Sequence, residues 1–356
     1  MSMPQCFAFA LGALLAAGVT AAEKHPGMDA FVERLAAGDE SRRAELADLL
    51  QAAEFQPAII AAMTRPAEGT KAWFEYRPIF ITEARISQGA EFYALNRELL
   101  ERSALTYGVP AEYLVSIIGV ETFYGRITGK WKVLDALATL AFYYPPRAPF
   151  FQGELEGFIN MPQARGITFD RGAALGSYAG AMGLGQFMPT SFIRWAVDAD
   201  SDSKIDLWSP GDDLFASVAN YLKEHGWVSG GPVVAPMVPG PTAKRLRDSG
   251  LDPIYPLSQL VAWGYQPDKQ SALAPDEASN LLSLEVARGE FAHFAIFANF
   301  RVITRYNRSP MYAMAVHELA QAIAARVPPV APVECAPELA PCAAVNEASA
   351  VKSDIR

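Results

Sequence analysis

The chain has 356 residues, of which 51% are hydrophobic and 19% charged, a composition typical of a folded protein with a sizeable core rather than of a disordered chain. Its formal net charge is −9, without runs of Lys or Arg, which argues against a nucleic-acid partner because a polyanion is bound by clustered cations. The sequence holds no H-E-x-x-H pair, Walker loop or strand-borne G-x-G-x-x-G, so zinc hydrolases and the commonest nucleotide-binding enzymes are disfavoured.

Residues 1–22 predict a secretory signal peptide. They carry no charged side chain, Phe7 to Val19 is apolar, and Thr20-Ala21-Ala22 offers small residues to a signal peptidase. The alternative is a single membrane anchor, for which the apolar run is short, so we expect no stable membrane span. Cys6 precedes the run and no cysteine follows it directly, which disfavours a lipid-anchored form.

Apolar residues at helical spacing predict short helices between Met28 and Met63. Trp73 to Pro78 is expected to form an aromatic turn, and a single long helix is expected to run through Phe92 and Leu105. Further helices are predicted up to about Trp227, with the chemistry-bearing segments among them.

The most informative of these helices contains Glu121. It follows Leu114, Ile117 and Ile118 by seven, four and three residues, so the four side chains share one helix face. Burial and a place near the helix C-terminus both disfavour negative charge, so this carboxyl group would keep its proton near neutral pH, as a general acid must. The alternative is a structural ion pair with an arginine such as Arg126.

A glycine-rich segment follows from Gly176 to Thr190, in which small residues permit the close approach of a ligand. No obvious strand precedes it, so a phosphate cradle is a poor explanation. Ser177 and Gln186 offer hydrogen bonds and nearby aromatic residues offer flat faces, a combination that suits sugar rings. The alternative is a tightly packed helix corner.

The segment Asp198 to Ser209 resembles an EF-hand calcium loop. Asp198, Asp200, Asp202 and Asp206 occupy its positions 1, 3, 5 and 9, whereas Ser203 and Ser209 replace the usual glycine and bidentate acid. The sequence therefore leaves open a weak structural Ca²⁺ site or a helix–loop–helix corner without an ion.

Residues 230–241 are rich in Gly and Pro with interspersed valines, which predicts short strands or a loop lobe, and a final helix is expected from Ser309 to Ala325. Residues 327–356 form a Pro-rich tail that is predicted to be disordered. Its two cysteines, Cys335 and Cys342, either form a local disulfide or remain free thiols. The fold class is mainly α, with a small β element (α+β).

Five segments in order resemble the lytic transglycosylase B family of bacterial peptidoglycan-cleaving enzymes. The resemblance spans about Met28 to Arg326, and the matching segments are Ile117–Thr122 with Tyr124–Arg126, Leu134–Phe142, Ser177–Pro189, Ser217–Trp227, and Thr304–Ser309 with Tyr312–Val316. The resemblance implies a lysozyme-like helical catalytic region at residues 23–326, with a helical lobe at about 28–105 and a core at about 106–326. It also implies a periplasmic location and peptidoglycan glycan strands as the partner.

The resemblance assigns Glu121 as the single acid/base and Ser177 as the residue that orients its carboxylate. It further implies that the saccharide groove is lined by Gln186, Phe187, Tyr221, Tyr306, Asn307, Tyr76 and Arg147. Relatives carry two adjacent arginines where this chain has Pro146-Arg147, which leaves one substrate contact in question. Without the resemblance, Tyr221 and Tyr306 would be helix-packing residues and Asn307 a turn or cap.

The implied reaction is cleavage of the MurNAc–GlcNAc β-1,4 bond with formation of 1,6-anhydroMurNAc ends, without a catalytic cofactor. Most glycoside hydrolases need two carboxylates, but no second acidic residue accompanies Glu121 in its motif or in the glycine-rich segment. The alternatives are a muramidase that hydrolyses the same bond with water, and a non-catalytic peptidoglycan-binding scaffold.

Overall fold

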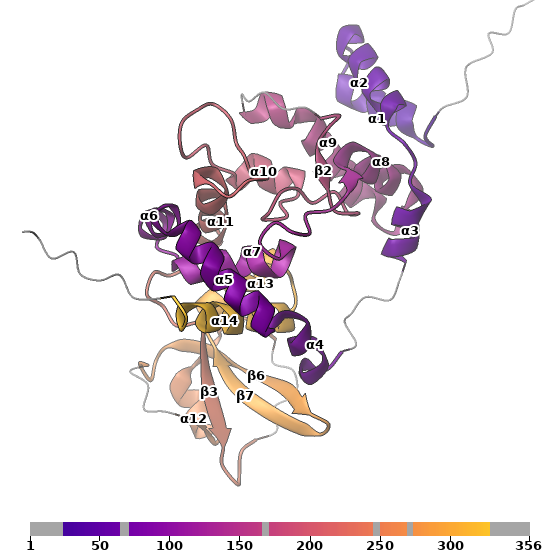
Figure 1. Ribbon diagram of the computed structural model, residues 1–356. Coiled ribbons are helices and arrows are strands. Elements are labelled where there is room, and N and C mark those ends of the chain that lie inside the picture. The colour runs from indigo at the N-terminus through magenta and orange to yellow at the C-terminus, as the bar shows by residue number, and fades with distance from the viewer. Residues whose placement is uncertain (1–23, 65–70, 166–170, 245–249, 269–272, 328–356) are drawn as a thin grey trace, which may run out of the picture.

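A computed structural model describes residues 24–64, 71–165, 171–244, 250–268 and 273–327 (Figure 1). The predicted signal peptide and the Pro-rich tail with Cys335 and Cys342 lie outside the described residues. The three short N-terminal helices are confirmed, and they are α1 (Met28–Ala36), α2 (Glu40–Ala52) and α3 (Pro57–Met63).

The aromatic turn predicted at residues 73–78 is wrong, because this segment is the helix α4 (Trp73–Phe80). The Glu75 carboxylate accepts a hydrogen bond from the Ala72 amide at 3.1 Å, which satisfies a free N–H group of the first turn. Trp73 and Tyr76 are buried. Capping and burial together outweigh the tendency of Pro78 to interrupt a helix.

The single long helix predicted through residues 92–105 is also wrong. The segment is divided at Asn96 into α5 (Glu83–Leu95) and α6 (Arg97–Tyr107). The Asn96 side chain donates to the Phe92 carbonyl at 2.9 Å, and such local bonds compete with helix continuation. Leu95 and Leu105, two apolar residues of the segment for which the long helix was predicted, are 78% and 88% exposed, so they do not belong to a continuous apolar face.

The helix α7 (Ala111–Thr122) forms the centre of the helical body, and nearly all of its residues are buried. It packs against α5, α6 and two later helices, α11 (Asp212–Glu224) and α14 (Pro310–Ala324). Figure 1 shows it near the middle of the molecule. A second part of the body consists of β1 (Trp131–Lys132), α8 (Val133–Tyr143), η1 (Pro145–Arg147), α9 (Ala148–Arg165), β2 (Leu175–Gly176) and α10 (Pro189–Trp195).

The β element is a five-stranded antiparallel sheet in the order β4-β6-β7-β3-β5. It contains β3 (Val234–Pro239), β4 (Tyr255–Pro256), β5 (Tyr265–Pro267), β6 (Ala278–Ala287) and β7 (Glu290–Ile296), with α12 (Leu257–Ala262) against it. Of the two alternatives for residues 230–241, short strands or a loop lobe, β3 confirms the strand, whereas the β6–β7 hairpin was not predicted. The chain then returns to the helical body through α13 (Ala298–Tyr306) and α14.

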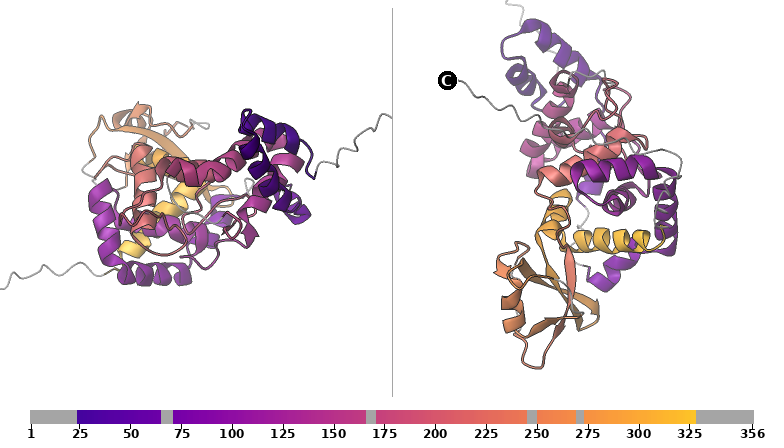
Figure 2. Two further views of the ribbon diagram at one scale, coloured as in Figure 1. Left: turned by 90° about the horizontal axis from the view of Figure 1, so that it is seen from above. Right: turned by 90° about the vertical axis from the view of Figure 1, so that its left-hand side faces the viewer.

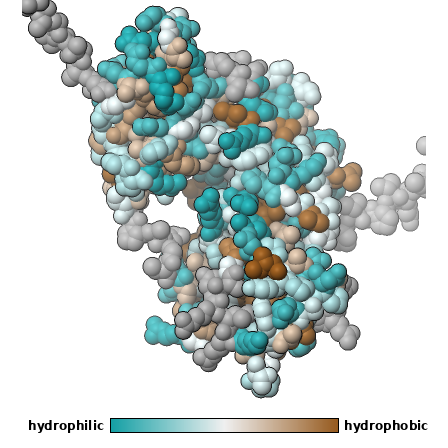
Figure 3. Space-filling view, turned by 180° about the vertical axis from the view of Figure 1, so that it is seen from behind, coloured by the Kyte–Doolittle hydropathy of each residue, from teal (hydrophilic) through white to brown (hydrophobic). Residues whose placement is uncertain are grey.

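The helical body and the sheet form two ends of an elongated molecule, with α1 to α3 at one end and the sheet at the other (Figures 1 and 2). Seen from behind, the surface is hollowed between these ends (Figure 3). Within the described ranges, no single helix has both the length and the apolar character needed to cross a membrane; α6 and α7, bent by 112°, meet that test only as a pair and only by length and composition.

Candidate active site

Glu121 lies in the last turn of α7 and is half-buried. Burial raises the pKa of Glu121 to about 7, although a hydrogen bond from Tyr312 partly opposes the shift. The negative end of the helix dipole at the α7 C-terminus acts in the same direction as burial. The carboxyl group is therefore poised to exchange a proton near neutral pH while part of it stays accessible.

The hydroxyl group of Tyr312 donates a hydrogen bond to Glu121 Oε1 at 2.6 Å. Tyr312 is buried in the first turn of α14, which Ser309 caps by accepting from the Tyr312 amide at 3.3 Å. The Ser116 hydroxyl on α7 also donates to the Val316 carbonyl of α14 at 2.6 Å. The packing of α14 against α7 thus holds the carboxylate in place, and no role had been predicted for Tyr312.

The chain turns sharply directly after Glu121. Phe123 and Tyr124 have φ of 52° and 59°, values in the left-handed region that side chains seldom adopt. The Thr122 hydroxyl accepts from the Gly125 amide at 3.1 Å and lies 3.0 Å from the Leu184 carbonyl. Thr122 therefore joins the end of α7 to the glycine-rich segment, which brings the two predicted motifs together.

The glycine-rich segment is held by backbone bonds at Gly176–Met182 and Met182–Phe187. The Ser177 hydroxyl accepts from the amides of Ala179 and Ala181 at 3.2 and 3.1 Å. Among the described residues it is Tyr312, and not the expected Ser177, whose hydroxyl bonds to Glu121. The recorded hydrogen bonds of the Ser177 oxygen lie within its own turn, where it accepts from two amides, as serine hydroxyls commonly do in turns.

Gln186 is half-buried and has a φ of 51°. Its Nε2 atom donates to the carbonyls of Thr128 and Gly183 at 3.2 and 2.9 Å. Both observed bonds use the amide nitrogen, and they fix the side chain against the loop that follows α7. In the described part of the chain, no recorded hydrogen bond uses its carbonyl oxygen.

Two of the predicted aromatic residues, Tyr221 and Tyr306, interact electrostatically with Glu121, and a third, Tyr76, interacts with its partner Tyr312. Burial raises the pKa of Tyr221 to about 12 and that of Tyr306 well above its usual range, and Glu121 contributes to both shifts. Tyr76, Glu121 and Tyr306 each contribute electrostatically to the raised pKa of the buried Tyr312. These phenols stay neutral at physiological pH and can donate hydrogen bonds.

The rings of this cluster are also structural. The hydroxyl groups of Tyr221 and Tyr306 donate to the carbonyls of Arg305 and Gly185 at 2.7 and 2.8 Å. Phe187 is only 2% exposed and packs against both tyrosines, with ring centroids 5.7 and 6.1 Å away. Phe187 therefore supports the tyrosines from behind rather than offering its face to solvent.

Two predicted groove residues lie apart from this cluster of contacts. Asn307 is exposed at the C-terminal cap of α13. Arg147 is exposed in η1, where its guanidinium lies 4.4 Å from the ring centre of Phe150. In the described part of the chain, neither side chain has a recorded contact with Glu121.

The acidic loop lies between α10 and α11. Carboxylate oxygens of Asp198, Asp200 and Asp202 lie within 4.8 Å of one another. Ser203, at the position of the usual glycine, has a φ of 68°, so the backbone makes the sharp turn of an EF-hand despite the substitution. The chemistry and spacing of these donors fit a hard cation such as Ca²⁺.

The sequence prediction missed the buried Asp213, in the first turn of α11. Its carboxylate accepts from the amides of Ala199 and Asp206 at 2.7 and 2.9 Å, which ties both sides of the acidic loop to the helix. Burial raises the pKa of Asp213, and the nearby Asp198 and Asp200 raise it further. The only available signal was an acidic residue at the start of a helix, which is typical of many helices.

The mainly helical body with a small sheet is the architecture of lysozyme-like lytic transglycosylases, as comparison with known proteins shows. The chain belongs to the family described as Transglycosylase SLT domain, whose model matches residues 23–321. It is 42% identical over 309 residues to the membrane-bound lytic murein transglycosylase B of Escherichia coli K12, covering 84% of this chain and 83% of that protein.

Two solved structures extend this comparison. The catenated lytic transglycosylase SltB1 of Pseudomonas aeruginosa is 45% identical, with a TM-score of 0.77 over 85% of this chain and 98% of its own. The E. coli lytic transglycosylase Slt35 in complex with calcium is 40% identical, with a TM-score of 0.76 over 85% and 94%. The chain is therefore an enzyme of the lytic transglycosylase class, and the predicted family and fold class are confirmed.

Proposed function

We propose that Glu121 is the single acid/base with which this enzyme cleaves the MurNAc–GlcNAc β-1,4 bond of peptidoglycan. The proposal rests on one observation above all, the half-buried Glu121 with its pKa raised to about 7. The shift comes from burial and is opposed only by Tyr312, so no neighbouring carboxylate is needed to explain it. A paired acid and nucleophile would require a second carboxylate close by.

In the first step, protonated Glu121 donates its proton to the oxygen that links MurNAc to GlcNAc. The bond between this oxygen and the MurNAc anomeric carbon breaks, and the electron pair leaves with GlcNAc. The acetamido group of MurNAc stabilises the positive charge that develops on the anomeric carbon. The tyrosine hydroxyl of Tyr312 then stabilises the carboxylate that remains.

In the second step, the ionised Glu121 takes the proton from the MurNAc C6 hydroxyl, whose oxygen attacks the anomeric carbon of the same sugar. The product is a 1,6-anhydroMurNAc end, and no water is consumed. Intramolecular attack benefits from proximity, so a positioned water is unnecessary. Mass spectrometry of the released muropeptides tests this reaction, because anhydro ends are one water lighter than the reducing ends that a muramidase would form.

We propose that the glycan groove runs past the tyrosine cluster around Glu121. Gln186 would present its carbonyl oxygen to a sugar amide or hydroxyl, and Tyr76, Tyr221 and Tyr306 would border the sugar at the cleaved bond. Phe187 would act by supporting these rings, and Ser177 by shaping the glycine-rich turn. Asn307 and Arg147 are exposed, as residues that contact outlying sugars would be.

Replacing Tyr312 with Phe tests the support of Glu121. Since the Tyr312 hydrogen bond lowers the pKa of Glu121, its loss should raise that pKa further, by roughly one unit for a bond to a charged group. The alkaline limb of the pH–kcat/KM profile should move upward, while the maximal kcat falls about tenfold to 100-fold. Tyr93→Phe, which removes a hydroxyl on α5, is the matched control. An unmoved alkaline limb would show that the hydrogen bond does not influence the catalytic proton.

We further propose that the acidic loop binds one Ca²⁺ through Asp198, Asp200 and Asp202. The ion would brace the connection between α10 and α11, and it takes no part in the reaction. Two observations support this proposal: the carboxylates converge, and Ser203 already has the left-handed conformation of the usual glycine. The relative Slt35 is described in complex with calcium.

Titration with 10 mM Ca²⁺ should raise the melting temperature by ~3 °C, as expected for a site with a Kd of about 0.1–1 mM. Ser203→Gly should stabilise the protein by about 0.5–1 kcal/mol and tighten calcium binding, because it removes the cost of a positive φ. Asp198→Asn with Asp202→Asn should abolish the calcium-dependent shift, and the exposed pair Asp48→Asn with Asp276→Asn should retain it. No shift in the unsubstituted protein would show that the loop binds no calcium.

We propose that the chain is exported to the periplasm and that residues 23–326 form the catalytic region. The uncharged, apolar N-terminal segment supports export. Fractionation of cells that produce the full chain, followed by mass determination of the mature N-terminus, tests both the cleavage after residue 22 and attachment to the membrane.

A further inference from the structure

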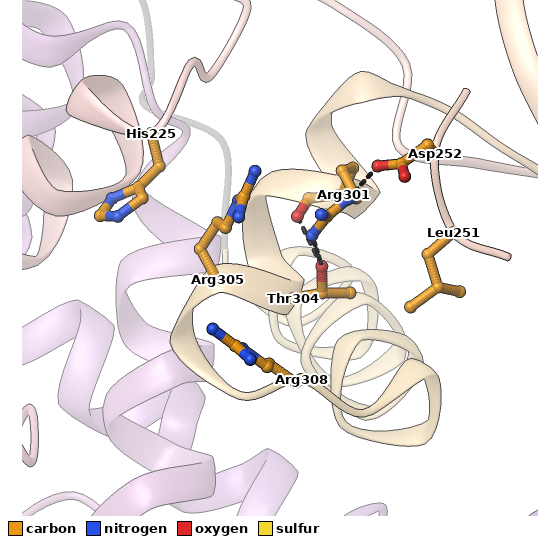
Figure 4. A pocket seen from close by; sticks show the side chains of 7 residues that line it. All are labelled: His225, Leu251, Asp252, Arg301, Thr304, Arg305 and Arg308. Carbon is orange, nitrogen blue, oxygen red and sulfur yellow. Dashed lines mark hydrogen bonds and ion pairs between the residues drawn. The ribbon is translucent and has the colours of Figure 1, made fainter. Parts of the chain in front are cut away.

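A cavity of about 590 Å³ lies beside α13, on the side where the chain returns from the sheet. Arg301, Arg305 and Arg308 line it together with Asp252, His225 and Leu251. Figure 4 shows the three arginines following α13 and the turn after it, with Arg305 between His225 and Arg301. We call this cavity the arginine pocket.

The arginine pocket carries an excess of positive charge. Asp252 forms an ion pair with Arg301 at 2.5 Å, and Arg301 also donates to the Thr304 hydroxyl at 3.0 Å. Arg305 also acts electrostatically on Asp252, but in the described part of the chain neither Arg305 nor Arg308 has a recorded ion pair. Three cations against one anion is unusual in a chain of net charge −9, and their mutual repulsion is offset when an anion binds.

A single tyrosine connects the arginine pocket to the catalytic region. The Tyr221 hydroxyl donates to the Arg305 carbonyl at 2.7 Å, and the His225 ring stacks on Tyr221 with centroids 4.1 Å apart. Tyr221 interacts electrostatically with both Arg305 and Glu121. Tyr221 therefore lies between the arginine pocket and Glu121, with contacts to Arg305 on one side and an electrostatic interaction with Glu121 on the other.

We propose that the arginine pocket binds the carboxylates of the peptide stem attached to MurNAc. This inference rests on the proposed function, because that reaction places MurNAc beside Glu121. Guanidinium groups bind carboxylates through two parallel hydrogen bonds, and in the described residues Arg305 and Arg308 line the pocket without a recorded ion pair. Leu251 supplies an apolar wall against which the methyl groups of a short peptide can pack. The pocket thereby gives the enzyme a preference for glycan that carries peptide.

The test compares disaccharide ligands that carry an intact stem, no stem, or a stem with amidated carboxylates. Binding is measured by calorimetry in the Glu121→Gln background, so that turnover plays no part. The Arg305→Gln/Arg308→Gln variant should lower the ratio of affinities, stem-bearing over stem-free, by about tenfold. The control, Lys244→Gln/Arg288→Gln, removes the same charge from exposed sites near the sheet and should keep the ratio of the parent. Amidated stems should bind the parent no better than they bind the arginine variant.

If the arginine variant loses affinity equally for both ligands, or for neither, the ratio of affinities is unchanged and the assignment of the pocket to stems is wrong. Inorganic phosphate at millimolar concentration and a free stem peptide are also compared as competitors of the stem-bearing ligand. If phosphate displaces this ligand as effectively as the free peptide does, the pocket is a general anion site and the assignment to stems is wrong. Release of anhydro products by the unsubstituted enzyme is assayed separately, on stem-bearing and on stem-free strands. Absence of anhydro products from both substrates would refute the proposed function, whereas the affinity ratio alone tests the assignment of the pocket.

Discussion

Replacing Glu121 with Gln should reduce the clearing of cell-wall suspensions by about 1000-fold or more, because the amide keeps the shape of the side chain but cannot donate a proton. In the unsubstituted enzyme, kcat/KM should fall as the pH rises through about 7, the value to which burial raises the pKa of Glu121. Above that pH the decline should approach tenfold per unit, because only the protonated fraction of enzyme can begin the reaction.

The same substitution should stabilise the protein at alkaline pH. The pKa of Glu121 is about 7 in the fold against 4.5 for the ordinary group, so the folded state binds this proton more tightly than the unfolded state. The resulting stabilisation is complete below pH 4.5 and is lost as the pH rises through 7. At pH 8 the buried negative charge therefore costs stability, and Glu121→Gln should raise the free energy of unfolding by about 1–3 kcal/mol.

Urea denaturation at pH 8 and at pH 4 measures this effect, which should be close to zero at the lower pH. Glu112→Gln, the same change in the first turn of the same helix, is the control and should retain activity. Undiminished clearing by Glu121→Gln would eliminate Glu121 as the acid. A stability difference that is equal at both pH values would instead contradict the account of its burial.

Replacing Gly129 with Ala should strongly destabilise the protein. An added Cβ atom would lie 2.0 Å from the Gly176 carbonyl oxygen and 2.5 Å from the Ser177 amide nitrogen, and Gly129 has a φ of 103°. The obstacles are backbone atoms of the glycine-rich segment, so the segment itself must move. We expect a loss of about 3–5 kcal/mol, a melting temperature lower by roughly 10 °C, and a corresponding fall in activity.

Gly153→Ala is the matched control for this prediction. Gly153 lies in α9, and an added Cβ atom meets nothing within 4 Å. In a helix interior, alanine in place of glycine should be neutral or stabilising by up to about 1 kcal/mol. If Gly129→Ala melted at the same temperature as the unsubstituted protein, the close approach of residues 129 and 176 would not constrain the active site.

Some elements of the fold followed from local patterns alone. The helix that carries Glu121, the strand near residue 235 and the final helix were predicted, because the apolar spacing and the Gly/Pro signals lie within each segment. The β6–β7 hairpin and the break at Asn96 were not predicted. Strand pairing and the choice of a side chain to bond its own backbone are decided by what packs around them.

The placement of a carboxyl group on an apolar helix face was determined by the sequence, since residues three, four and seven apart share a face in any α-helix. Which group holds that carboxyl was decided only by the tertiary structure. Tyr312 lies 191 residues further along the chain, and Ser177 uses its oxygen within its own turn. Helical periodicity is a property of neighbouring residues, whereas a hydrogen bond between α7 and α14 exists only because the packed core brings the two helices together.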